Sequence, residues 1–470
     1  MGELHDLTLL EQAAAVRDKS VSPVELVEHY LARIDRLSDR VGAFVTVTAD
    51  LALDAAKAAA DQVGDGSGLP ELYGVPTAIK DLNLVAGVPT TFGTSAWPAA
   101  DLGIDDAVTA KLKAAGLISL GKTNTPEFGL PCYTEPDVAP PARTPWDLAR
   151  SAGGSSGGAA AAVAAGLVPA AQGSDGGGSI RIPASVCGLF GIKPSRGRVS
   201  NAPVSPEISG LAVNGPLART VRDAAALLDA MAGPAPGDWQ WAPPPPQSFL
   251  SSCDASPGRM NIGRFATPVI ADAPVHPECM AAYEAASELL SDLGHYVFDY
   301  SPTFTADLVP AFETVWSAEF LNLPISSDDE PKTRPLTRWI RDRGRTASGQ
   351  QVYAALATLR RAARTELTAS ARYDAILTPT LAQPPALVGG LRDDDDPAAD
   401  FDAQKRFTPF TAPYNMSGQP AVSVPLHWTA DGLPIGVQLI GRPYDEVTLL
   451  SLSAQLEAAA PWAQRRPSCW

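Results

Sequence analysis

Apolar residues recur at helical spacing through the first part of the chain, and residues 6–60 favour helix for most of their length. The apolar face of one helix is formed by positions three and four apart: Leu26, Val27, Tyr30, Leu31, Ile34 and Leu37. Ser22-Pro23-Val24-Glu25 has the form of a capping box with proline at the first helical position, so this helix should begin after Ser22. A second amphipathic helix is expected from 48 to 63, where a glycine-rich turn ends it.

Short apolar runs alternate with helical segments along the rest of the chain. Strands are expected at 73–81, 117–120, 167–171, 297–300, 375–377 and 434–440. Helices are expected at 106–115, 159–165, 276–293, 316–323, 352–367 and 449–456. This alternation is typical of layered α/β proteins. The proline-rich stretch 235–260 is expected to be a surface linker.

Composition narrows the class of protein. The 470 residues, 45% of them hydrophobic, suit a globular chain of one large domain or two merged ones. A net charge of -16 disfavours nucleic acid and anionic membranes as partners, since both are bound through basic surfaces. The five cysteines show no C-x-x-C spacing, and neither a signal peptide nor a membrane-spanning run is evident, so a reduced, cytoplasmic protein is expected.

Two glycine-serine clusters, 153–158 and 173–179, bracket an alanine-rich run in the middle of the chain. Glycine lets the backbone approach a ligand closely, so these loops should expose bare amides either to a phosphate or around a nucleophile. A phosphate-loop pattern, G-x-x-x-x-G-K-T, does occur at 116–123. Its middle residues are strand-forming and a helix precedes it, which inverts the order that a phosphate loop needs, so we interpret it as a chance match.

Two serine chemistries and one metal site can be weighed from the residues alone. Residues 153–157 fit the G-x-S-x-G nucleophile elbow, but no strand precedes them and none of the five histidines adjoins a glycine-rich loop, which argues against a histidine triad. A serine can instead be activated by a neutral lysine, and Lys80, at the end of an apolar strand, is placed to be desolvated. Ser179 follows three glycines whose amides could hold an oxyanion. The acidic run 393–396 is expected to be a solvated loop, because no histidine supports a metal there.

The central motifs resemble those of the amidase signature family, the serine-serine-lysine amide hydrolases. The matching motifs are GGSSGG at 153–158, GSDGGGSIRIPAS at 173–185, GIKPSRGRVS at 191–200, GVPTAIKD at 74–81, LGKTNTPEFG at 120–129 and NMSGQPAVSVP at 415–425. The resemblance implies an α/β fold with a large twisted mixed β-sheet sandwiched between helices. It also implies a single domain over 1–470, with the signature core at about 70–215 and a variable substrate-channel region at about 235–410.

Carried over by position, the resemblance gives each motif residue a role. Lys80 matches the catalytic lysine, Ser155 the bridging serine held by a cis peptide, and Ser179 the nucleophile. The implied oxyanion hole consists of the amides of Gly176, Gly177, Gly178 and Ser179. Of the neighbouring residues, Ser156 is expected to give an ancillary hydrogen bond, Asp175 and Arg181 a structural ion pair, and Cys187 only packing. No cofactor and no metal is implied.

The substrate is less clear from the sequence than the chemistry. Thr134-Glu135 is followed by PDVAPPART, which departs from the family pattern, and Phe128, Tyr133 and Thr134 are expected to border the substrate channel. The chain is similar to stand-alone bacterial amidases, among them nylon-oligomer amidases and metagenomic urethanases. That similarity implies hydrolysis of linear amides, aryl amides and carbamates by a monomer or homodimer.

Two other functions remain open at this point. One is the amidase subunit of a glutamine-dependent aminoacyl-tRNA amidotransferase, which would work with partner chains. The other is a catalytically inactive binding module on the same scaffold, although a binder would have no need to keep Lys80, Ser155 and Ser179 together.

Overall fold

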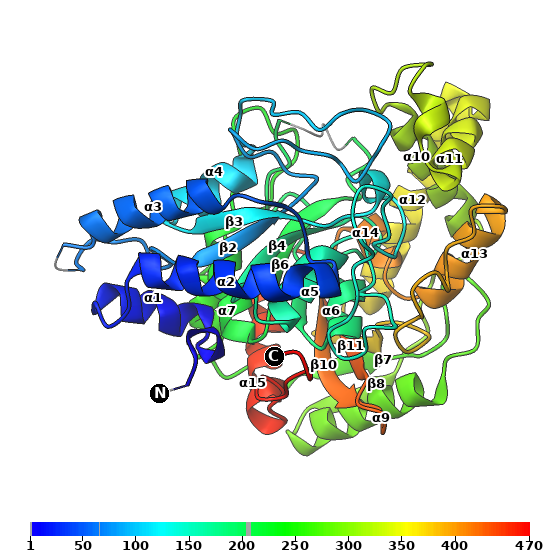
Figure 1. Ribbon diagram of the computed structural model, residues 1–470. Coiled ribbons are helices and arrows are strands. Elements are labelled where there is room, and N and C mark those ends of the chain that lie inside the picture. The colour runs from blue at the N-terminus through cyan, green and yellow to red at the C-terminus, as the bar shows by residue number, and fades with distance from the viewer. Residues whose placement is uncertain (1, 65, 204–207) are drawn as a thin grey trace.

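The computed structural model describes residues 2–64, 66–203 and 208–470 (Figure 1). Within these residues one mixed sheet of 11 strands runs through the molecule. In order across the sheet, the strands are β1 (Phe44–Val47), β3 (Ile118–Thr123), β2 (Pro76–Lys80), β4 (Ala170–Asp175), β6 (Val213–Ala218), β5 (Phe190–Lys193), β10 (Ala421–Trp428), β11 (Pro434–Gly441), β9 (Ala375–Pro379), β7 (Asn261–Arg264) and β8 (Tyr296–Asp299).

The strands that pair with β2 determine which strand ends lie together at one edge of the sheet. Strand β2 is parallel to β3 on one side and to β4 on the other, with Ala78 opposite Ala171. Parallel neighbours end at the same edge of a sheet, which is where ligands bind in open α/β folds. The end of β2 at Lys80 and the end of β4 at Asp175 therefore meet at that edge.

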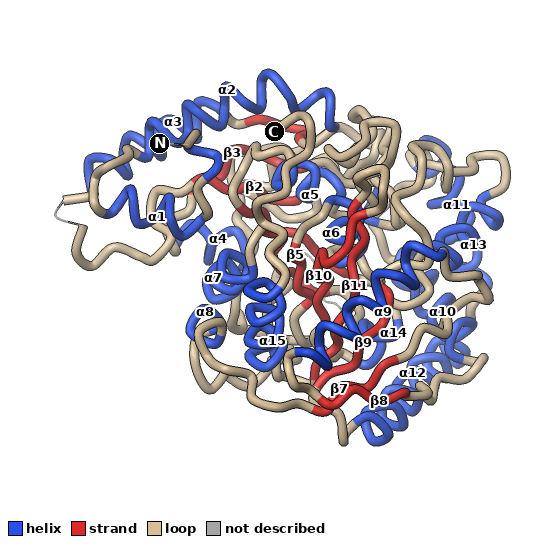
Figure 2. Tube along the Cα trace, turned by 90° about the horizontal axis from the view of Figure 1, so that it is seen from below, coloured by secondary structure: helices blue, strands red, loops and turns tan. Residues whose placement is uncertain are grey.

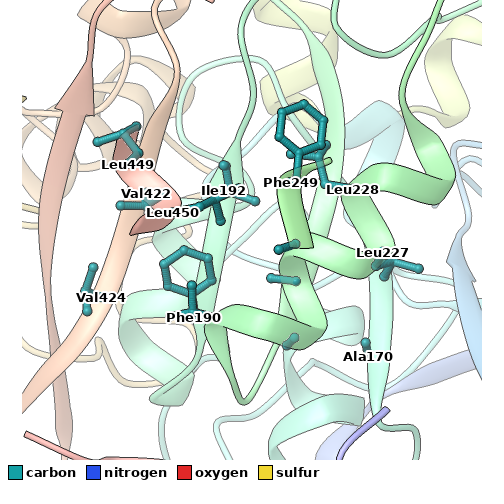
Figure 3. Packing of buried hydrophobic residues seen from close by; sticks show 14 of the residues in the cluster. Ala170, Phe190, Ile192, Leu227, Leu228, Phe249, Val422, Val424, Leu449 and Leu450 are labelled. Carbon is teal, nitrogen blue, oxygen red and sulfur yellow. The ribbon is translucent and has the colours of Figure 1, made fainter. Parts of the chain in front are cut away.

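Helices cover both faces of the sheet. The buried cluster on one face takes residues from α2 (Pro23–Val41), α3 (Ala49–Gln62), α5 (Gly157–Ala164) and α6 (Arg181–Cys187). The cluster on the other face takes residues from α1 (Leu9–Arg17), α4 (Ala107–Ala114), α7 (Val221–Met231), α8 (Phe249–Ser252), α9 (Pro277–Asp292) and α15 (Glu446–Ala459). Figure 3 shows this second cluster, in which Phe190, Ile192, Val422 and Val424 of the sheet meet Leu227, Leu228 and Leu449.

The remaining helices lie beside the C-terminal half of the sheet (Figure 2). They are α10 (Leu308–Leu321), α11 (Pro335–Thr346), α12 (Gly349–Ser370), α13 (Pro397–Phe407) and α14 (Pro413–Ser417). Three short 3-10 helices complete the set: η1 (Leu4–Asp6), η2 (Glu127–Gly129) and η3 (Glu330–Lys332). No helix in the described part of the chain is both long and apolar enough to cross a membrane.

The predicted fold class, a mixed sheet between helices, is confirmed, and the element predictions hold with local corrections. Ser22 caps α2 as its motif predicts, but β1 interrupts the helical stretch expected over 6–60. The strand expected at 167–171 instead begins at Ala170 and continues to Asp175. The chain leaves α5 through Gly166, whose φ of +64° turns it, so the apolar residues 167–168 are buried in a turn. The expected linker 235–260 contains the one-turn helix α8.

Candidate active site

The amine of Lys80 is enclosed by three serine hydroxyls. Lys80 ends β2 with 0% of its side chain exposed. Its Nζ donates to the Oγ of Ser155 at 2.8 Å, of Ser174 at 2.9 Å and of Ser156 at 3.0 Å. The Lys80 backbone amide donates to the Oε1 of Gln172 at 2.8 Å, which ties the end of β2 to β4.

Burial makes this amine easy to deprotonate. Desolvation lowers the pKa of Lys80 to about 7, against an opposing effect of the Asp175 carboxylate, which raises it. A neutral amine has two N–H donors and one lone pair, whereas the ammonium has three donors and no acceptor. Ser156 Oγ donates to the Ser174 carbonyl at 3.1 Å, so towards Lys80 it can only accept. The lone pair of neutral Lys80 can therefore accept a hydrogen bond only from the hydroxyl of Ser155 or of Ser174.

Ser155 lies in a tightly fixed loop. The Gly154–Ser155 peptide is cis, as the resemblance implies, and Ser155 is 2% exposed. Its carbonyl accepts from the hydroxyl of Thr125 at 3.1 Å and from that of Thr134 at 3.5 Å. Thr134 also accepts from the Gly157 amide at 3.1 Å, so one side chain holds the backbone at both Ser155 and Gly157.

Asp175 organises the loop that carries Ser179. Its carboxylate accepts from the amides of Gly178 at 2.7 Å and Ile180 at 3.2 Å, and it pairs with Arg181 at 2.9 Å. Burial alone would raise the pKa of Asp175, but the Arg181 guanidinium holds it well below its usual range. The predicted ion pair between Asp175 and Arg181 is confirmed, with both side chains 0% exposed.

Ser179 stands at the accessible side of this loop. It is half-buried, and among the described residues no hydrogen bond to its hydroxyl is found, so its hydrogen bond to Ser155 is not formed in this structure. Catalytic hydrogen bonds are often completed only when substrate is present. The Gly178 amide, one of the four expected oxyanion donors, already donates to Asp175 in this structure. The assignment of Gly176, Gly177 and Ser179 as donors stays a prediction.

The residues expected to border the substrate channel lie in different settings. Phe128 is 8% exposed and meets Trp97 with ring centroids 5.2 Å apart. It precedes Gly129, where a Cβ would lie 3.3 Å from Ser155 Oγ, so this backbone runs beside Ser155. Tyr133 and Thr134 are buried and make internal hydrogen bonds, Thr134 within the Ser155 loop. Their contact with substrate stays a prediction.

The other sequence motifs are accounted for by structure. The phosphate-loop match lies within β3 and its approach, and Lys122 donates to Asp81 at 2.8 Å with both side chains fully buried. Burial raises the pKa of Cys187 to about 12, which suits a packing residue rather than a reactive thiol. The acidic run 393–396 is exposed loop, as expected.

Sequence reasoning did not identify Ser174 or Gln172 as partners of Lys80. Both lie on β4, and because side chains alternate along a strand, residues two apart share one face. The pattern Gln-x-Ser, which puts two polar side chains on one face of β4, was the available signal. It is a weak one, because it becomes meaningful only when β4 is known to lie next to β2.

One set of side chains in the described residues could hold a metal ion, Glu3, His5 and His29, but Nδ1 of His5 lies 3.0 Å from Nε2 of His29, at hydrogen-bond distance. Desolvation, helped by Arg33, lowers the pKa of His5 to about 4. A cavity of about 690 Å³ lies between α9 and α13, and its lining includes none of Lys80, Ser155 and Ser179.

Comparisons with known proteins identify the family of the chain. A family model described as Amidase matches residues 25–450. The 6-aminohexanoate-cyclic-dimer hydrolase of Paenarthrobacter ureafaciens is 35% identical over an alignment of 482 positions. The alignment covers 97% of this chain and 95% of that protein. A solved 6-aminohexanoate cyclic dimer hydrolase with bound substrate superimposes with a TM-score of 0.91 at 32% identity, covering 99% of this chain and 100% of that one. A bacterial aryl acylamidase of the amidase signature family gives a TM-score of 0.86 at 29% identity, covering 98% of each chain.

Proposed function

The chain belongs to the amidase signature family of C–N hydrolases, and from this premise we propose that it cleaves linear amides, aryl amides and carbamates through a covalent intermediate on Ser179. The relatives support the amide part of this proposal. One is named a 6-aminohexanoate-cyclic-dimer hydrolase and another an aryl acylamidase.

In the proposed mechanism neutral Lys80 accepts a proton from Ser155, and Ser155 accepts one from Ser179. The Ser179 oxygen attacks the substrate carbonyl, and the resulting oxyanion is held by the amides of Gly176, Gly177 and Ser179. Ser155 then gives its proton to the departing nitrogen, and Lys80 returns a proton to Ser155. Water then attacks the acyl-enzyme carbonyl while it gives a proton to Ser155, whose own proton passes to Lys80. The proton returns through Ser155 to the Ser179 oxygen, which releases the acid and frees Ser179.

One observation carries the proposal: a fully buried lysine amine whose partners are serine hydroxyls. No carboxylate is among the hydrogen-bond partners of Nζ in the described residues, so only the more distant Asp175 opposes the desolvation that lowers the pKa of Lys80. An amine with a pKa of about 7 can serve as a general base at neutral pH.

Carbamates fit the same steps. Attack of Ser179 on a carbamate carbonyl with loss of the alcohol gives a carbamoyl-enzyme, and water then releases the carbamic acid. The oxyanion formed on the carbonyl oxygen is the same in both reactions, so the three free amides serve both.

The test is a kinetic comparison of purified wild-type protein and Ser179→Ala on a p-nitroanilide and on an O-aryl carbamate. We expect wild-type turnover of both substrates and loss of both in the variant. Turnover of neither substrate by the wild type, or equal turnover by the variant, contradicts the proposal. Size-exclusion chromatography with light scattering tests the accompanying proposal that the protein is a monomer or homodimer.

A further inference from the structure

A buried chain of hydrogen bonds joins helix α13 to the backbone beside the relay serine, and the mechanism above does not use it. Tyr133 donates its hydroxyl to Oδ2 of Asp400 at 2.5 Å. Nε2 of Gln404 donates to Oδ1 of Asp400 at 2.5 Å, and Oε1 of Gln404 accepts from the Cys132 amide at 3.0 Å. Asp400 and Gln404 are one helical turn apart, so α13 hydrogen-bonds to two consecutive residues, Cys132 and Tyr133.

The segment held in this way lies directly against Gly154. A Cβ on Gly154 would be 2.7 Å from both the backbone N and the backbone C of Tyr133, and 2.9 Å from the backbone C of Cys132. These atoms therefore touch the Cα of Gly154, and Ser155 follows one peptide bond later. A shift of Tyr133 must displace Gly154 and move the Ser155 hydroxyl relative to Lys80.

The link is protected from water at both ends. Tyr133 and Asp400 are each 1% exposed, and desolvation raises the pKa of both groups. The Asp393 amide donates to the same carboxylate at 3.0 Å. Removing one partner of a buried hydrogen bond leaves the other unsatisfied, which costs free energy. This contact therefore holds the segment in one place.

We propose that Asp400 is a positioning residue: through Tyr133 it fixes Gly154 and so holds the Ser155 hydroxyl in line with Lys80. Tyr133, which the sequence placed at the substrate channel, then serves the relay instead of the substrate. The inference rests on the proposed function, because it assigns Asp400 to the relay of that reaction. A misplacement of about 1 Å can cost roughly a hundredfold in rate, so a modest shift is enough to be measured.

The experiment is a double-mutant cycle in kcat with a p-nitroanilide, using Tyr133→Phe, Asp400→Ala and the double variant. We expect each single variant to lower kcat about tenfold with KM within about twofold of the wild-type value. The double variant should be no slower than the slower single one, because both remove the same link. Asp400→Asn keeps an oxygen acceptor for the tyrosine and should retain about half of the wild-type kcat.

Tyr300→Phe is the matched control. The Tyr300 hydroxyl donates to buried Glu366 of α12 at 2.7 Å, which is the same kind of contact, away from the serine loops. This variant should lower the melting temperature and leave kcat unchanged. The inference is overturned if the single variants keep their kcat while the melting temperature falls, if their effects multiply in the double variant, or if Tyr300→Phe slows kcat as much as Tyr133→Phe does.

Failure of the proposed function would be visible separately. If the wild-type protein turns over neither an anilide nor a carbamate, the cycle is measured from the rate at which an aryl fluorophosphonate labels Ser179. If the effects of the two single variants on the labelling rate multiply in the double variant, the positioning role of Asp400 is rejected. Intact coupling in labelling without turnover rejects only the proposed substrates.

Discussion

Lowering the pH should switch off the reaction by protonating Lys80. In the folded protein desolvation lowers the pKa of this amine to about 7, and only the neutral form can accept a proton from Ser155. The rate is therefore full above that pH and falls as pH drops through it. At pH 5, two units below, about 1% of the amine is neutral, so kcat/KM should be about a hundredfold below its plateau, or about 2.7 kcal/mol in barrier.

The assay is kcat/KM for a p-nitroanilide between pH 5 and 9, because this ratio reports the free enzyme. The acid limb should have a slope of one log unit per pH unit and a midpoint near 7. Ser174→Ala removes one acceptor of the ammonium form, so its midpoint should move downward by about one unit. A midpoint near 4, typical of a carboxylate, or an upward shift in Ser174→Ala, would refute the reasoning. A denaturation curve at each pH excludes unfolding as the cause.

Four substitutions test the triad and the loop that carries Ser179. Lys80→Arg, which stays charged, and Ser179→Ala should each lower kcat about a thousandfold or more with the circular dichroism spectrum unchanged. A residual kcat above about a tenth of the wild-type value would count against the triad. Gly178→Ala should destabilise the protein by about 2 kcal/mol, because Gly178 has a φ of +138° and a Cβ there would collide with Thr411; an unchanged urea midpoint would argue against this loop geometry. Arg181→Met leaves a buried carboxylate without its cation and should cost about 4 kcal/mol in the same urea titration, whereas a loss below about 1 kcal/mol would show that the carboxylate finds other support.

The sequence was most informative where its motifs are dense. Six ordered motifs predicted the family and the fold class, and both are confirmed. The same motifs pointed to Lys80 and Ser155, whose side chains the fold brings to hydrogen-bond distance where β2 ends and the loop before α5 passes. Their catalytic roles, like the single domain over 1–470, stay predictions until they are tested by experiment.

What the sequence missed depends on tertiary geometry. The amide of Gly178 looked as available as its neighbours, and only the reach of the Asp175 carboxylate shows that it is occupied. Tyr133 looked like a channel residue because it adjoins a segment that departs from the family pattern. Its partner, Asp400, lies 267 positions along the chain, in a helix that the sequence analysis did not single out. Local patterns carry no information on such contacts.

The central claim, that Ser179 is the nucleophile, is tested most directly by mapping a covalent adduct. The wild-type protein is treated with an aryl fluorophosphonate, digested and analysed by tandem mass spectrometry, with Lys80→Arg as the comparison. The account predicts one phosphonylated residue, Ser179, and labelling at least about a hundredfold slower in Lys80→Arg. An adduct on Ser155, or labelling at an unchanged rate in the lysine variant, would contradict it.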